Sequence, residues 1–75
     1  MAMKTIRELR EGRGWTQFQL AVKAEVTPST ISNWERGATE PKVGQLRKLA
    51  RLFEVPMDLI EVADEGVNTT GKRAA

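Results

Sequence analysis

One set of polar side chains recurs at positions i, i+3, i+4 and i+7 of a single segment: Ser29, Ser32, Asn33 and Arg36. If this segment is helical, the spacing places the four on one face, with Ile31 and Trp34 on the other. Ser and Asn form helices less readily than Glu, Lys or Ala, so helix stability does not explain their choice. Such short hydroxyl and amide groups beside a base could bond base edges in a DNA major groove, where Asn pairs with adenine through two hydrogen bonds. A solvated helix face is the alternative interpretation.

The composition argues against catalysis and covalent cross-links. The chain has 75 residues and contains neither Cys nor His, which excludes disulfides, zinc sites and acid–base chemistry based on His. No glycine loop that could cradle a phosphate and no pair of nucleophile and base can be assembled from the residues present. We therefore expect a protein that is not an enzyme and needs neither cofactor nor metal.

The charges are distributed unevenly along the chain. Residues 1–53 hold ten basic and five acidic side chains, whereas residues 54–65 hold five acidic side chains and no basic one. A polyanion fits the first part as a partner, although a solvated surface explains the same imbalance. No apolar run approaches the roughly 18 residues of a membrane span. Lys4, Arg7 and Glu8 stand where a signal peptide needs an apolar segment. We expect no membrane association and a cytoplasmic location.

Helical patterns recur along most of the chain, and no stretch alternates apolar and polar residues long enough to predict a strand. These patterns predict an all-α domain of five short helices. The first is expected over residues 4–11 and is ended by Gly12 and Gly14. The second has a complete start signal, because Thr16 can cap it and Gln19, three residues on, can close a capping box.

A third helix begins with similar chemistry. Thr27 can cap it, and Pro28 occupies the first helical position, where a missing N–H does no harm. Gly37 then stops it. Only residues 24–26 separate the second helix from this cap. Two helices joined so closely must cross steeply, which predicts a helix-turn-helix.

An apolar stripe predicts the fourth helix: Val43, Leu46, Leu49, Ala50 and Phe53. Val55 and Pro56 break this pattern, and a short fifth helix is expected over residues 57–62. The remaining residues are small, polar or charged and have no apolar pattern. We therefore predict one domain over residues 1–63 and a flexible tail over residues 64–75.

Many of these residues resemble the helix-turn-helix core of the lambda repressor and Cro-like family, also called the XRE family. The resemblance rests on Gly14, Trp15, Thr16, Gln17, Leu20, Ala21, Val26, Thr27, Ser29, Thr30, Ile31, Ser32, Trp34, Glu35, Arg36 and Gly37, and continues through Pro41, Leu46, Leu49, Ala50, Leu52 and Val55. It covers about residues 4–62 and implies a lambda-repressor-like domain of five helices. The docking geometry usual in this class places the second helix of the helix-turn-helix in the major groove.

The resemblance also implies which side chains meet DNA: Gln17, Thr27, Ser29, Thr30, Ser32, Asn33, Arg36 and Lys42. Of these, Asn33 and Ser29 are the expected base readers. Gln17, at the start of the second helix, is expected to reach the DNA backbone, because the free N–H groups of a helix N-terminus favour a phosphate.

Several of these residues have a structural interpretation as well. Thr27 is already explained as a helix cap, and Thr30 could bond its own backbone in place of a phosphate. Arg36 suits a helix C-terminus even without DNA, although we favour a phosphate contact. Lys42 follows Pro41 in a loop that approaches the DNA backbone in this family, and a solvated lysine explains it equally well.

Other matches and departures concern the fold. In related repressors the residues corresponding to Arg10 and Glu35 form a partly buried ion pair, which we expect here. Glu25 stands where the family commonly has Gly, and a positive φ there costs about 1 kcal/mol. Phe18 and Val22 replace residues that are usually polar. They either cover the first helix or form a small patch for a partner.

The function expected from these residues is sequence-specific binding of double-stranded DNA by a transcriptional regulator, most simply a repressor. One module reads few bases, so a homodimer on a palindromic operator is expected, with half-sites about 34–36 Å apart. The dimer surface is expected at the chain's acidic end: Met57, Leu59 and Ile60. The alternative is a protein-interaction module, such as an antitoxin that masks a toxin protein.

Overall fold

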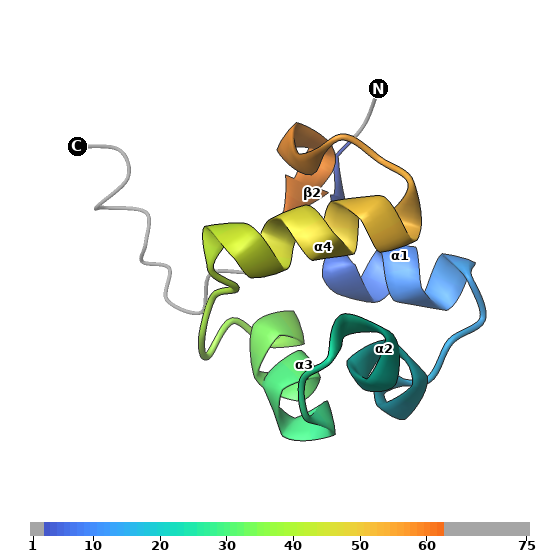
Figure 1. Ribbon diagram of the computed structural model, residues 1–75, viewed down its shortest axis with the longest axis vertical. Coiled ribbons are helices and arrows are strands. Elements are labelled where there is room, and N and C mark those ends of the chain that lie inside the picture. Colours follow the sequence, from blue (N-terminus) through green and yellow to red (C-terminus); the bar gives the residue numbers. More distant parts are fainter. Residues whose placement is uncertain (1–2, 63–75) are drawn as a thin grey trace.

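Four α-helices and three short elements make up residues 3–62, which are the part of the chain that the computed structural model describes. The helices are α1 (Ile6–Gly12), α2 (Gln17–Ala24), α3 (Pro28–Glu35) and α4 (Val43–Phe53). The short elements are the strands β1 (Lys4–Thr5) and β2 (Ile60–Glu61) and the 3₁₀ helix η1 (Met57–Leu59). In Figure 1, α2 and α3 lie together at one end of the molecule and the strands lie at the other. The predicted tail over residues 64–75 lies outside the described residues.

The helix starts follow the sequence closely. Thr16 Oγ1 accepts the Gln19 backbone N–H at 3.0 Å, and Gln19 Oε1 accepts the Thr16 N–H at 2.9 Å, which completes the predicted capping box. Thr27 caps α3 by accepting the Thr30 N–H at 3.2 Å. Thr5 and Glu8 form a second capping box at α1. This pair has the same spacing and was equally readable in the sequence, but it was not predicted.

The two ends of the domain differ from the prediction. β1 and β2 pair in parallel, with Lys4 beside Ile60 and Thr5 beside Glu61, so the expectation of no strand is wrong. α1 therefore starts at Ile6 rather than at residue 4, because Thr5 remains extended as its cap. The expected fifth helix over residues 57–62 is also wrong: one 3₁₀ turn leads directly into β2. Strands of two residues are too short to show an alternating pattern, and they form only because distant segments meet.

Side chains from every helix build the core. The most deeply buried of the large ones come from α1, α2, α3 and α4 respectively: Ile6, Leu20, Ile31 and Leu49. Trp34, Phe53 and Ile60 complete it, and Trp15 packs against Phe53 with ring centroids 5.6 Å apart. The predicted stripe on α4 is correct at Leu49, Ala50 and Phe53, but Val43 is 62% exposed because it lies at the first residue of the helix, beyond the core.

The link between α2 and α3 is a tight turn at Glu25. This residue adopts the left-handed conformation, with φ 62° and ψ 43°, and its side chain bonds the Lys48 ammonium of α4 at 2.7 Å. The Val26 N–H donates to the Ala21 carbonyl at 3.0 Å and closes the end of α2. None of the helices within residues 3–62 is long and apolar enough to cross a lipid bilayer.

Candidate nucleic-acid interface

The two faces of α3 lie as its spacing predicts. Ile31 and Trp34 are 0% and 2% exposed and anchor the helix in the core. Ser29 and Arg36 are exposed, and Ser32 and Asn33 are half-buried. The exposed side of α3 is therefore a row of hydroxyl, amide and guanidinium groups held in place by a buried apolar face.

Several polar groups around this row already have partners within the protein. The hydroxyls of Thr27 and Thr30 lie 2.9 Å apart as part of the helix cap. Arg36 Nη2 donates to Asn33 Oδ1 at 2.9 Å. Lys42 is exposed at the start of α4, where its backbone N–H donates to Gln45 Oε1 at 2.8 Å. These bonds restrict which atoms remain free to meet a ligand.

Gln17 lies at the first position of α2, half-buried against α3. Its Nε2 donates to Glu35 Oε1 at 3.0 Å. The side chain is therefore engaged with the last turn of α3.

Glu35 is the centre of a buried charge cluster that joins three helices. Its side chain is 1% exposed, and Arg10, 11% exposed, donates to both carboxylate oxygens, from Nε at 2.6 Å and from Nη2 at 3.2 Å. Arg10 Nη1 also donates to the Trp15 carbonyl at 2.9 Å. Arg7 lies 3.6 Å from Glu35 as a further cation that sequence reasoning missed. The expected pair of Arg10 and Glu35 is thus present, and it ties α1 to α3.

The pKa values of this cluster follow from its contacts. Burial by itself raises the pKa of Glu35, but hydrogen bonds from Arg10 and Gln17, helped by the charges of Arg10 and Arg7, outweigh it and hold the pKa below its ordinary value. The hydrogen bond to Glu35 raises the pKa of Arg10. Both side chains are charged at neutral pH, so the cluster presents little net charge to a ligand beyond that of Arg7.

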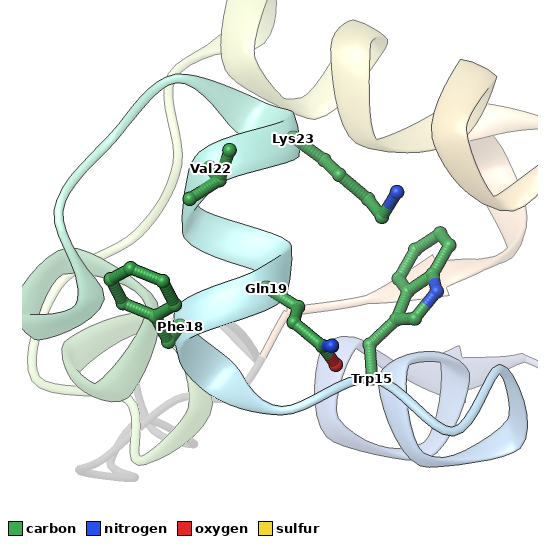
Figure 2. Close-up of a pocket in the computed structure, with 5 residues that line it drawn as sticks. All are labelled: Trp15, Phe18, Gln19, Val22 and Lys23. Carbon is green, nitrogen blue, oxygen red and sulfur yellow. The ribbon is translucent and has the colours of Figure 1, made fainter.

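Phe18 and Val22 form an apolar patch on the outer side of α2. They are 64% and 62% exposed, so the interpretation that they cover the first helix is wrong. Together with Trp15, Gln19 and Lys23 they line a shallow hollow, shown in Figure 2. The Lys23 ammonium lies 4.8 Å from the centroid of the Trp15 ring. Two turns of α2 thus present an apolar surface with a cationic rim.

The residues expected to form a dimer surface have different surroundings. Ile60 is 4% exposed and belongs to the core of its own chain, where β2 pairs with β1. Its side chain is therefore not offered to a partner. Met57 and Leu59 are half-buried in η1 beside the exposed Asp58.

The chain belongs to a helix-turn-helix family, because the model of that family, described as "Helix-turn-helix", matches residues 6–60. This match spans all four α-helices. It confirms the resemblance to the XRE family, which was expected over about residues 4–62.

Three relatives are similar to most of this chain. It is 34% identical over 62 residues to the HTH-type transcriptional regulator ImmR of Bacillus subtilis, covering 83% of this chain and 49% of ImmR. It is 34% identical to the competence pilus inhibition repressor of Acinetobacter baylyi, covering 91% of this chain and 62% of that protein. It is 30% identical to the antitoxin HipB of Escherichia coli, covering 92% of this chain and 75% of HipB. The chain thus spans about half of the first relative and more of the other two.

Proposed function

We propose that this protein binds double-stranded DNA sequence-specifically and regulates transcription, with α2 and α3 as its helix-turn-helix and α3 in the major groove. The observation that carries the proposal is the orientation of α3. Its apolar face, Ile31 and Trp34, is buried, and its opposite side presents the exposed Ser29 and the half-buried Asn33. Such groups allow close approach and can bond base edges.

The other candidate residues suit contacts to the DNA backbone. Thr27 and Lys42 are exposed, and Gln17 lies at the N-terminus of α2. A phosphate at that terminus would meet free backbone N–H groups. Affinity would then come mainly from contacts to phosphates, and discrimination from Ser29, Ser32 and Asn33.

The working form that we propose is a homodimer on a palindromic operator, acting as a repressor. A single α3 offers few base-reading side chains, and two copies related by a two-fold axis double the sequence that is read. Met57 and Leu59 are the proposed contact, since they are the partly exposed apolar residues of η1. The name of the Acinetobacter relative, a repressor, supports this direction of regulation.

Selection of bound fragments from random duplex DNA tests the proposal. We expect enrichment of a palindrome whose half-sites lie about one helical turn apart, 10 to 10.5 base pairs, or a multiple of that. Enrichment of a single half-site would contradict the homodimer but not DNA binding. If no sequence is enriched even at low salt, the proposed function is wrong.

A second candidate function, the antitoxin or other protein-interaction module, is favoured by the exposed patch of Phe18 and Val22 and by the name of HipB. Purification of the protein from its natural host tests it. A stoichiometric protein partner should be lost with Val22→Glu and retained with Val43→Glu, because both valines are 62% exposed but only Val22 lies in the patch. Loss with both variants, or with neither, would contradict a role for the patch.

A further inference from the structure

We infer that Arg36 positions the Asn33 amide, so that the two side chains act together as a donor-rich edge that selects guanine rather than adenine in the major groove. This inference rests on the proposed DNA-binding function and names the base that α3 reads. It replaces two expectations from the sequence, namely that Asn33 pairs with adenine and that Arg36 contacts a phosphate.

The geometry begins with the bond between the two side chains. Arg36 Nη2 donates to Asn33 Oδ1 at 2.9 Å, and the residues are three apart, one turn along α3. A guanidinium has only donors, so the amide atom that faces it must be the oxygen. The same amide carbon of Asn33 carries the NH₂ group, and this orientation of the amide leaves the NH₂ group for a ligand.

The backbone supports this arrangement. Arg36 is the C-cap of α3, and its N–H donates to the Ser32 carbonyl at 3.1 Å. Asn33 is half-buried, and its own carbonyl accepts the Ala38 N–H at 2.9 Å. The backbone of both residues is therefore fixed by hydrogen bonds. The side-chain bond links the two polar groups at the C-terminal end of α3.

The bond changes what Asn33 can recognise. Pairing with adenine requires the amide oxygen to accept from the adenine N6 amino group while the NH₂ donates to N7. Here one lone pair of that oxygen is occupied by a cation, which also repels the partly positive N6 amino group. Guanine presents O6 and N7, both acceptors, at the same edge. The amide NH₂ and the remaining guanidinium N–H groups can only donate, so guanine is the complementary base.

The test measures base preference in duplexes derived from the selected operator. Asn33→Ala first locates the base pair that Asn33 reads, as the position where discrimination is lost. At that position we expect the wild-type protein to prefer guanine over adenine by about tenfold, the size expected for one good contact. Arg36→Ala should shift the preference to adenine, because it frees the amide oxygen. Arg51→Ala, which removes an exposed arginine from α4, should leave the preference for guanine unchanged.

Three results would overturn the inference. The wild-type protein could prefer adenine, or Arg36→Ala could retain the preference for guanine. Alternatively, Arg36→Ala could weaken binding to all duplexes equally and reduce the slope of log affinity against log salt by about one, which would make Arg36 a phosphate contact. Each of these results leaves DNA binding intact. If the wild-type protein binds no duplex, the proposed function fails and this inference fails with it.

Discussion

Arg10 and Arg36 both donate hydrogen bonds to side chains of α3, but their surroundings differ. The Arg10 side chain is 11% exposed and donates two hydrogen bonds to the Glu35 carboxylate, whose side chain is 1% exposed. Arg36 is exposed and holds the Asn33 amide through one. Removing a member of the first pair leaves a buried charge without its partner, which is costly. Water can replace either member of the second pair at little cost. Burial thus separates an arginine that maintains the fold from one that is available to a ligand.

The largest effect in this comparison is expected for Arg10→Ala. Glu35 would remain buried without its bidentate partner, so the free energy of unfolding should fall by about 3–5 kcal/mol. Chemical denaturation monitored by tryptophan fluorescence measures this loss. A loss below about 0.5 kcal/mol would mean that the pair behaves as a solvent-exposed one.

Arg10→Lys tests whether the geometry of the pair matters beyond its charge. Lysine keeps the cation but cannot donate simultaneously to both oxygens of Glu35 and to the Trp15 carbonyl. We expect the free energy of unfolding to fall by about 1–3 kcal/mol, because acceptors are left without a donor. Stability equal to that of the wild-type protein would show that charge alone is sufficient.

The acid dependence of stability should come largely from Glu35. The pKa of Glu35 is lowered in the folded state, so unfolded chains bind the proton more readily. The free energy of unfolding therefore rises with pH between the folded and the unfolded pKa. The contribution is complete above the unfolded pKa, near 4.5, and is lost as the pH falls through the folded pKa. Glu35→Gln should flatten the pH dependence of the free energy of unfolding below about pH 4.5, where Glu35 contributes to it.

Glu25→Gln is the matched control for this titration. The pKa of Glu25 is also lowered, by a hydrogen bond from Lys48, but its side chain is 76% exposed. Water screens the exposed pair, so this variant should change the acid dependence less than Glu35→Gln does. The opposite order would contradict the importance of the buried cluster.

The smallest effect on stability is expected for Arg36→Ala, within about 0.5 kcal/mol of the wild-type protein, as for most surface substitutions. Thermal unfolding of Arg36→Ala, with Arg51→Ala as the control, measures this effect. If Arg36→Ala destabilises the protein as much as Arg10→Ala does, the distinction between a buried structural arginine and an exposed one is wrong.

Local features of the chain could be predicted well. The start of α2 at Thr16 and that of α3 at Thr27 and Pro28 follow from bonds within one helical turn. The burial of Ile31 and Trp34 follows from their spacing. The positive φ at Glu25 was anticipated only through the family resemblance, since nothing in its side chain favours that conformation.

Other features depend on neighbours that the local pattern does not contain. The exposure of Val43 depends on where the core ends, and that of Phe18 and Val22 depends on which helix faces α2. β1 and β2 form only because both ends of the domain meet at one edge. The sequence predicted a break at Val55 and Pro56 with a short helix after it, but not that Ile60 would return to the core.

The sequence by itself determined the helix starts, the closeness of α2 to α3 and the two faces of α3, because caps, turns and periodicity act over a few residues. Only the tertiary structure decided that α1 and α2 enclose the carboxylate of Glu35 and that an apolar patch stays uncovered on α2. Arg10 and Glu35 are 25 residues apart, and a bond over that distance exists only after the helices have packed. Its strength comes from the exclusion of water by that packing.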